Sequence, residues 1–398
     1  MTGIGLVTPI GTGAQEFWRS LVQGRAGAGP VRTFDATGLP NQVGCEVRGP
    51  DIPGALAASV LGGRCSELAL LAAVQAVRDA GLEETIRGRA DCAVIVGTTM
   101  GDVTKFEADR ASHPERETDE ADVSSLAGRP LDIMGRTIAR HFDLTGTVRT
   151  VPAACAAGAY AIGLAAALVA RGEARAAIAV GCEAFSRLAF VGFSRMRAMS
   201  PDVCRPFSLG RSGLLLGEGA GAVVLEPWET VRAQDRRAAG FIDGFGLSCD
   251  AWHVTGPHPE GEGAVRAMAD ALARAGVDPS SVDYVNAHGT GTPLNDRSES
   301  LAIRRLFGER GRRVPVSSIK ALTGHMMGAS GAVEAIASLL ALERGAVPPT
   351  WNWSAPDPEC DIDCVPNEPR EADLRVVLSN SYAFGGNNAS LVLSKAAA

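Results

Sequence analysis

Short apolar runs alternate along the chain with alanine-rich segments of helical length. The strand-like runs include residues 92–96, 177–180, 222–225 and 390–393. The helix-like segments include residues 67–80, 156–171, 263–275 and 331–344. An alternation of strands and helices is typical of α/β folds, and the pattern therefore predicts an α/β protein.

The two parts of the chain show a similar order of predicted elements. In the first part, the strand-like run 147–151 leads to Cys155 and then to an apolar helix. In the second part, the run 314–318 leads to His325 and then to another apolar helix. We therefore predict two similar α/β halves that share a core, residues 1–240 and 241–398.

Residues 151–170 form an uncharged run of 20 residues, which is long enough to span a bilayer. The run consists mainly of Ala and Gly, with Pro152 near its start. We interpret it as a helix buried on all sides in a large soluble protein, and we predict no membrane association. Residues 105–122 are acidic, polar and poorly periodic, and they predict a surface excursion.

The composition excludes several classes of protein. With 46% hydrophobic and 21% charged residues in 398, the chain is neither disordered nor fibrous. The net charge of -7 argues against a general nucleic-acid binder. Nine cysteines lack a framework spacing, and residues 1–5 have no basic or apolar signal, so we expect free thiols in the cytoplasm. Only Lys105, Lys320 and Lys395 are lysines among 38 basic residues.

Cys155 is a candidate nucleophile. It lies among small residues at the predicted start of an apolar helix. The positive end of a helix dipole and unpaired N–H groups favour the thiolate, which is the nucleophilic form of cysteine. The alternative is a cysteine that simply packs in the core, which is our interpretation of the other eight.

Two histidines strengthen this candidate. His288 lies in a turn rich in Gly and Thr after the strand-like run 282–285, and His325 lies in a glycine-lined turn before a helix. A helix N-terminus disfavours imidazolium, so we expect His325 to remain a neutral hydrogen-bond donor. Each histidine alone is more often structural. Together with Cys155 they predict a nucleophile with two polarising donors.

Around these residues the chain resembles the β-ketoacyl-[acyl-carrier-protein] synthases of the elongating, Cys-His-His type. The matching motifs are ACAAG around Cys155, GEGAGAVVLEP at 217–227, NAHGTGTPLND at 286–296, SSIKALTGHMMGASGAVEA at 317–335 and SNSYAFGGNNASLVL at 379–393. They cover nearly the whole chain in the family's order. The resemblance implies a thiolase-like five-layer αβαβα fold made of two related halves. It also implies a homodimer, or a heterodimer with a ketosynthase-like subunit.

The resemblance implies a reaction in two stages. An acyl chain passes from the phosphopantetheine of an acyl carrier protein to Cys155, and a malonyl-carrier protein then loses carbon dioxide. Its carbanion attacks the thioester in a Claisen condensation that gives a β-ketoacyl product. His288 and His325 would stabilise the enolate, and the backbone N–H groups of Cys155 and Phe384 would hold the thioester oxyanion. The phosphopantetheine belongs to the partner, so no cofactor is implied.

Further residues match the family's motifs. Lys320 and Glu334 match a lysine and a buried glutamate near the triad, although most lysines are solvated surface residues. Thr290 and Thr292 match hydroxyls that bind the pantetheine arm.

The glycine-rich turn near the C-terminus is assigned to substrate binding. Phe384 matches a gate to the acyl tunnel, with a core aromatic as the alternative, and Gly385 follows it in the same turn. For three further matching residues we expect a structural role: Asn295, Asp296 and Glu299.

The chain also departs from the family pattern. It begins inside the family's first strand, so we expect that strand to be short or the start to be assigned late. Ser208 and Ser212 stand where aspartates are common, which alters a local ion pair, and the turn at 382–387 has unusual residues. Residues 60–64, which often carry the basic docking charges, hold one charge. A docking patch for the carrier protein is therefore assigned to three arginines: Arg195, Arg197 and Arg205.

Several alternatives remain. An initiating synthase would have Asn in place of His325, and a thiolase would have a second cysteine near the C-terminal glycine turn. A chain-length-determining subunit would lack Cys155. The catalytic subunit of a heterodimeric type II polyketide ketosynthase stays open, as does an acyltransferase that forms esters or amides. Cys360 and Cys364 lack a second ligand pair, so no metal site is predicted.

Overall fold

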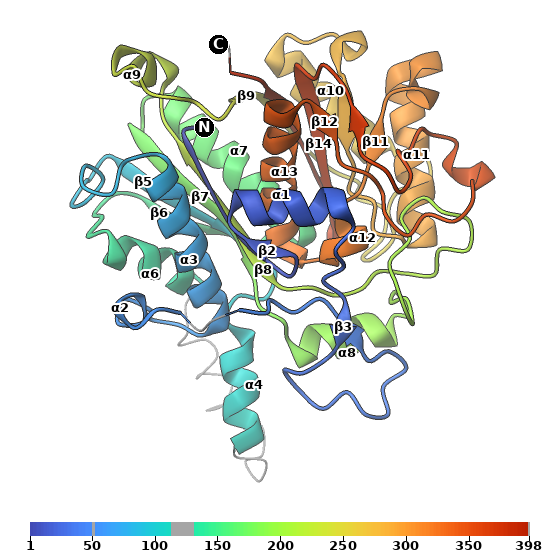
Figure 1. The fold of residues 1–398 in the computed structure, drawn as a ribbon, viewed down its shortest axis with the longest axis horizontal. Helices are drawn as coiled ribbons and strands as arrows, with labels where there is room; N and C mark the ends of the chain where they lie inside the picture. The colour runs from blue at the N-terminus through green and yellow to red at the C-terminus, as the bar shows by residue number, and fades with distance from the viewer. Residues whose placement is uncertain (50–51, 113–130, 397–398) are drawn as a thin grey trace.

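Two β-sheets form the framework of the molecule (Figure 1). The structure is a computed structural model that describes residues 1–49, 52–112 and 131–396. The first sheet has the order β2-β1-β8-β7-β5-β6. Its strands are β1 (Gly3–Thr8), β2 (Gly11–Thr12), β5 (Cys92–Gly97), β6 (Val148–Val151), β7 (Ala176–Glu183) and β8 (Gly219–Leu225). In this sheet β5 pairs in parallel with β6 and β7, whereas β8 pairs antiparallel with β1 and β7.

The second sheet has the order β11-β10-β14-β15-β9. Its strands are β9 (Phe241–Cys249), β10 (Tyr284–Asn286), β11 (Val316–Ser317), β14 (Val376–Tyr382) and β15 (Asn387–Ser394). Here β10 pairs in parallel with β11 and β14, and β15 pairs antiparallel with β14 and β9. Two short antiparallel pairs are the other named strands in the described residues: β3 (Gly29–Pro30) with β4 (Val43–Gly44), and β12 (Ala346–Val347) with β13 (Arg370–Glu371).

Helices fill three layers around and between these sheets. α7 (Ala157–Ala170) and α13 (Ser330–Arg344) lie between the sheets, α3 (Arg64–Asp79) and α6 (Ile133–His141) cover the first sheet, and α10 (Glu262–Ala275) with α11 (Pro293–Phe307) flank the second. The remaining α-helices in the described residues are α1 (Ala14–Gln23), α2 (Gly54–Ala57), α4 (Val103–Ser112), α8 (Arg187–Arg195), α9 (Trp228–Ala233) and α12 (Lys320–Thr323). The predicted five-layer αβαβα architecture is therefore confirmed. The division at residue 240 stays a prediction.

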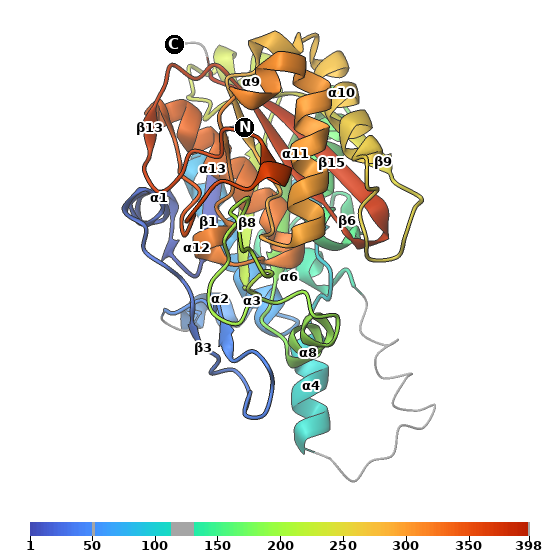
Figure 2. The ribbon, with the colours of Figure 1, turned by 90° about the vertical axis from the view of Figure 1, so that its right-hand side faces the viewer.

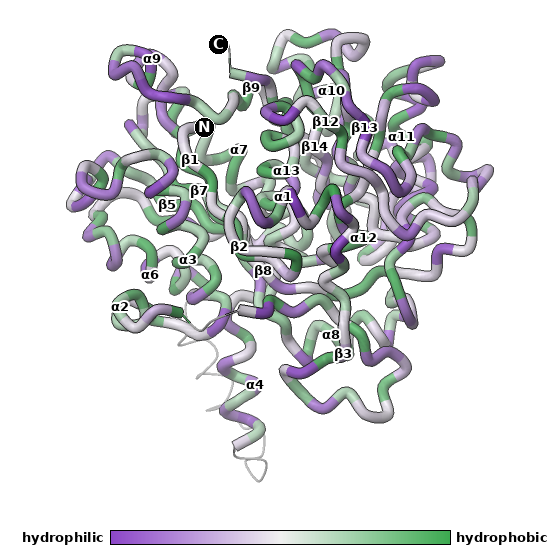
Figure 3. Tube along the Cα trace, viewed as in Figure 1, coloured by the Kyte–Doolittle hydropathy of each residue, from purple (hydrophilic) through white to green (hydrophobic). Residues whose placement is uncertain are grey.

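The core follows these layers. Separate apolar clusters lie between the sheets, beneath α3 and beneath α10, and α7, which lies between the sheets, is largely hydrophobic (Figure 3). The central helices approach closely because small residues line their contact. A methyl group at Gly158 of α7 would lie 2.7 Å from the backbone nitrogen of Ala332 in α13. This close packing explains why the uncharged run is built of Ala and Gly.

One expectation about an individual element needs correction. α7 is not buried on all sides by this chain, because Leu164 is 39% exposed and Tyr160 is only half-buried. The first strand, β1, has six residues, and the expectation about its length relative to the family stays a prediction. None of the helices in the described residues is long and apolar enough to cross a membrane.

The predicted surface excursion begins as a helix. α4 has no buried residue and extends away from the body of the molecule in both views (Figures 1 and 2). Residues 113–122 of the predicted excursion lie outside the described residues. The other strands and helices predicted from the pattern all form within two or three residues of the expected bounds.

Candidate active site

Cys155 lies in a sharp turn between the first sheet and α7. The turn is the 3-10 helix η1 (Ala154–Ala156), and Ala154 has φ 47°, a left-handed conformation that is uncommon for alanine. The side chain is 5% exposed and lines a cavity of about 320 Å3. His288, His325 and Phe384 line the same cavity, so the structure brings together the predicted nucleophile, both histidines and the predicted gate.

The resting cysteine is a thiol rather than the thiolate expected from the helix start. Burial raises the pKa of Cys155 to about 12, against the opposing effect of the Lys320 charge. Glu183 raises this pKa further, whereas hydrogen bonding to the backbone N–H groups of Cys155 and Phe384 lowers it. Desolvation therefore outweighs the effect of the helix terminus on this pKa. The two N–H groups near sulfur are those predicted to hold a thioester oxyanion.

His288 follows β10 and is fixed through its backbone. The carboxylate of Glu299 accepts the N–H groups of His288 and Gly289, both at 2.8 Å. Burial, followed by the Lys320 charge and then by the proximity of His325, lowers the pKa of His288 well below its ordinary value. The imidazole is therefore neutral at physiological pH, and Glu299 has the structural role predicted for it.

His325 faces His288 from the second turn. The two ring centroids are 5.3 Å apart and the rings are nearly perpendicular. The backbone N–H of His325 donates to Leu215 at 2.7 Å, and Nδ1 lies 3.1 Å from the hydroxyl of Ser330. Burial and the Lys320 charge lower the pKa of His325 well below its ordinary value. Both histidines are thus neutral, as predicted for His325.

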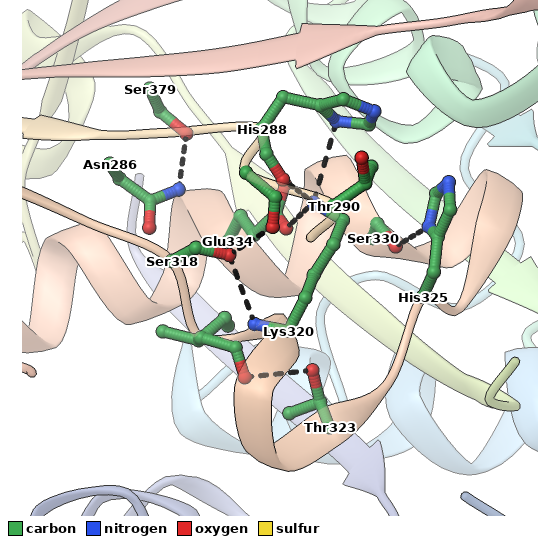
Figure 4. A network of polar contacts seen from close by, with 12 residues as sticks. Asn286, His288, Thr290, Ser318, Lys320, Thr323, His325, Ser330, Glu334 and Ser379 are labelled. Atoms are coloured by element: carbon green, nitrogen blue, oxygen red, sulfur yellow. Dashed lines mark hydrogen bonds and ion pairs between the residues drawn. The ribbon is translucent and has the colours of Figure 1, made fainter. Parts of the chain in front are cut away.

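Lys320 is buried beneath His288 (Figure 4). Its ammonium donates to the carbonyl oxygen of His288 at 2.6 Å, lies 3.4 Å from Nδ1 of the same residue and pairs with Glu334. The alternative of a solvated lysine is therefore wrong. An ammonium group has only donors, so Nδ1 accepts and Nε2 carries the imidazole proton. Lys320 thus selects the tautomer that can donate into the cavity.

The predicted pantetheine hydroxyls lie together at the cavity. Thr290 and Thr292 both line it, and their hydroxyls are 2.8 Å apart. Asp296 accepts the N–H of Gly291 at 3.2 Å and lies 3.6 Å from the buried guanidinium of Arg211. The structural role expected for Asp296 is therefore to brace the loop that carries the threonines.

Ser208 and Ser212, which depart from the family pattern, make hydroxyl contacts with Ser354 and Ser200. The buried guanidinium of Arg211 pairs with Asp296 and Asp357. The effect of the two serines on a local ion pair stays a prediction.

Phe384 and Gly385 lie in the same turn but make different contacts. Phe384 is half-buried, and its ring packs 5.6 Å from that of Phe193 at the cavity wall, so it is not a core aromatic. Gly385 is exposed, does not line the cavity and has φ 80°; its N–H donates to Val254 at 2.7 Å. Among the described residues Gly385 therefore shapes the turn rather than contacting the space a substrate would occupy.

The three arginines of the predicted docking patch differ. Arg197 is exposed at the cavity mouth, and Arg195 is exposed nearby on α8. Arg205 is half-buried in a two-pronged ion pair with Asp202, with N–O distances of 2.9 and 2.8 Å. Its charge is thus already neutralised, and the Asp-x-x-Arg spacing in the sequence was the signal for this pair.

Sequence analysis did not identify three residues near the site. Phe193 of α8 and Met196, the residue that follows this helix, line the cavity. Glu183 is fully buried at the end of β7, next to the cysteine turn. The sequence feature that could have identified Glu183 is a charged residue at the end of an apolar strand. Within the described residues, no group of three or more ligating side chains is arranged to hold a metal ion.

Comparison with known proteins agrees with this geometry. The family model of the β-ketoacyl synthase N-terminal domain matches residues 1–230, and that of the C-terminal domain matches residues 239–354. The chain belongs to the β-ketoacyl synthase family. The family, the fold and the acyltransferase class predicted from the sequence motifs are confirmed.

Three similar proteins illustrate the range of this family. The chain is 38% identical to the 3-oxoacyl-[acyl-carrier-protein] synthase 2 of Coxiella burnetii, over 99% of this chain and 98% of that protein. It superposes on the ishigamide ketosynthase/chain length factor with a TM-score of 0.91 and 38% identity, covering 100% of this chain and 98% of the other. A type II PKS acyl-carrier protein in complex with its ketosynthase bound to the hexaketide gives a TM-score of 0.88 at 27% identity, covering 99% and 98%.

Proposed function

We propose that this protein is a β-ketoacyl-[acyl-carrier-protein] synthase that condenses an acyl group held on Cys155 with malonyl-carrier protein. One observation carries the proposal: the buried thiol, two neutral imidazoles and two backbone N–H donors meet in a single cavity. This set matches the needs of thioester exchange followed by enolate formation.

In the first stage the sulfur of Cys155 attacks the carbonyl carbon of the acyl-carrier thioester. The developing oxyanion accepts hydrogen bonds from the N–H groups of Cys155 and Phe384. The carbon–sulfur bond to the carrier breaks, and the carrier thiolate leaves with the proton lost from Cys155. Because burial raises the pKa of that thiol to about 12, the proton must be removed as the substrate enters.

In the second stage a malonyl thioester replaces the free carrier. The Nε2–H group of His288 and a ring N–H group of His325 donate to its thioester oxygen as carbon dioxide leaves, because negative charge collects on that oxygen. The resulting carbanion attacks the thioester carbon on Cys155, and the β-ketoacyl chain stays on the carrier. The bond to sulfur breaks, and Cys155 leaves as a thiolate that takes up a proton from water to restore the thiol. The low pKa values of both histidines keep them as neutral donors throughout.

The proposed substrate carrier is an acyl carrier protein, so the enzyme needs no cofactor of its own. A similar ketosynthase has been solved with its acyl-carrier protein, which supports this kind of partner. Arg197 stands exposed at the cavity mouth, with Arg195 nearby, where an acidic carrier would dock. The free state of all nine cysteines is compatible with the cytoplasmic location that we propose.

We further propose a second ketosynthase-like subunit as a stable partner. Leu164 of α7 and Leu247 of β9 are exposed apolar residues, and α7 contacts β9. β6 ends the first sheet and β9 ends the second, so each leaves one edge unpaired among the described residues. This continuous face fits another copy, or a chain-length-factor subunit as in the ishigamide ketosynthase/chain length factor. In the second case the protein would be the catalytic subunit of a type II polyketide ketosynthase.

The test of the condensing function uses the intact protein and a panel of acyl-carrier proteins. We expect a mass increase equal to the acyl group in the wild type and none in Cys155→Ala. We also expect carbon dioxide release from malonyl-carrier protein. An acyl adduct without any carbon dioxide release would instead identify an ester- or amide-forming acyltransferase. Absence of an adduct dependent on Cys155 would overturn the proposal.

A further inference from the structure

Glu183 lies at the junction of three segments that build the active site. It is the last residue of β7 and is fully buried. Its carboxylate accepts the N–H groups of Thr99 at 2.7 Å, Met100 at 2.9 Å and Gly328 at 3.1 Å, and the hydroxyl of Thr98 at 3.3 Å. Each carboxylate oxygen thus accepts two donors, one pair on Oε1 and one on Oε2.

These donors come from segments that are distant in the sequence. Thr98, Thr99 and Met100 follow β5, while Gly328 belongs to the 3-10 helix η4 (Met327–Ala329) directly after His325. The helix η4 packs against η1, which carries Cys155. A methyl group at Gly328 would lie 2.8 Å from Glu183 and 2.6 Å from the backbone of Thr98, so these segments are in close contact.

The packing on the β5 side reaches the cavity wall. Met100 packs in the same apolar cluster as Phe193 and Phe384. Glu183 therefore holds one backbone on the acyl side of the cavity and another on the His325 side. No sequence motif or proposed reaction step assigns it this role.

We propose that Glu183 is a positioning residue for Cys155, whose carboxylate ties the end of β5 to the turn after His325 beneath the cysteine. The inference rests on the proposed function, since it concerns the geometry of the acyl-transfer site. All four donors are neutral, so the carboxylate also brings a negative charge close to the thiol. Burial raises the pKa of Glu183 to about 7, and above that pH the charge opposes ionisation of Cys155.

Glu183→Gln keeps one side-chain oxygen and replaces the other carboxylate oxygen by an amide NH2 group. Its amide NH2 group cannot accept the two donors that one oxygen accepts now, so we expect acyl transfer to fall about tenfold. With the charge removed, the pH midpoint for alkylation of Cys155 by iodoacetamide is expected to fall by about one unit. Glu183→Asp keeps the charge but shortens the side chain, so it should lose acyl transfer and keep the high alkylation midpoint.

Glu299→Gln is the matched control. Glu299 is equally buried, has a pKa raised to about 7 and holds two backbone N–H groups, but those belong to His288 and Gly289. This variant should leave the alkylation midpoint of Cys155 unchanged. Thr98→Val removes only one donor and should give a smaller loss of acyl transfer in a protein that folds even if Glu183→Gln does not.

A wild-type alkylation profile together with wild-type acyl transfer in Glu183→Gln would overturn the inference. So would an equal shift in Glu299→Gln, because it would show a general loosening of the fold. Alkylation needs neither carrier protein nor condensation. If the wild type accepts no acyl group, the proposed function fails while the role of Glu183 beneath Cys155 is still measured.

Discussion

The chemistry of individual side chains in this protein is set by burial more than by sequence neighbours. The buried Lys320–Glu334 pair shows this, because the lysine lies under His288 rather than in solvent. Lys320→Met would leave the Glu334 carboxylate without its cation and cost about 3–5 kcal/mol in the free energy of unfolding. The double variant Lys320→Met/Glu334→Leu should recover most of this loss.

The same pair of variants separates stability from function. In the double variant His288 still lacks the donor that fixes its tautomer, so release of carbon dioxide from malonyl-carrier protein should stay about a hundredfold below wild type. Urea denaturation and a decarboxylation assay on the same samples measure both. Recovery of activity along with stability would show that Lys320 acts only as a structural cation.

The buried carboxylate beneath His288 makes a pH prediction. Burial raises the pKa of Glu299 from its ordinary value of 4.5 to about 7. The folded state therefore holds this proton more tightly than the unfolded state, and the contribution to stability is lost as pH rises from about 4.5 to about 7. Between pH 5 and 7.5, the free energy of unfolding of Glu299→Gln should rise more with pH than that of wild type. Parallel curves from urea titrations would contradict this.

At this scale the sequence predicts which residues meet but not what their surroundings do to them. Cys155, His288 and His325 were identifiable because their motifs mark turns at element ends. The thiol form of Cys155 was not, because desolvation depends on segments brought in from β14 and α13. Gly385 was assigned to substrate binding because it follows Phe384 in the same turn. In this tight turn the adjacent residue faces another way, and the N–H group of Gly385 donates to the carbonyl oxygen of Val254.

At the scale of the elements, the close crossing of α7 and α13 depends on glycine. Gly158→Ala would place a methyl carbon 2.7 Å from the nitrogen of Ala332 and 2.8 Å from the oxygen of Gly328. Since both are backbone atoms, the helices must separate, at a cost of about 1–3 kcal/mol. Gly192→Ala in α8, with no atom within 4 Å of the added methyl, should instead stabilise the protein by about 0.5–1 kcal/mol. Thermal unfolding of both variants checks the contrast; equal shifts would contradict it.

The elements themselves were largely predictable from the sequence, since alternating apolar runs mark both strands and helices. The environment of α7 was not. An all-apolar helix has no polar face to indicate its exposed side, so periodicity alone predicted complete burial. Only the arrangement of the layers shows that Leu164 is left uncovered.

At the scale of the whole molecule, a net charge of -7 must still allow an acidic carrier to dock. Arg197→Glu at the cavity mouth should raise KM for acyl-carrier protein about tenfold and leave kcat nearly unchanged, because encounter is weakened but chemistry is not. Arg313→Glu is the control, since this exposed arginine precedes β11, at the opposite end of the sheet from His288. Unchanged kinetics of Arg197→Glu with carrier-bound substrate would remove Arg197 from the docking surface.

The exposed face of α7 predicts how the chain assembles with a second subunit. Leu164 and Leu247 are 39% and 37% exposed on adjacent elements, next to two sheet edges that lack a partner in the described residues. Burying such a face against a second ketosynthase-like subunit removes apolar surface from water and can extend the sheets. We expect the purified chain to be dimeric by sedimentation, and Leu164→Arg to shift it to monomer by placing a charge in the contact. Leu188→Arg, at a 54% exposed leucine on α8, should leave the dimer intact. A wild-type chain that is monomeric alone and dimerises only with a chain-length-factor subunit would contradict self-association. It would favour the heterodimer, because the face that carries Leu164 and Leu247 would then bind the surface of a different subunit and not its own copy.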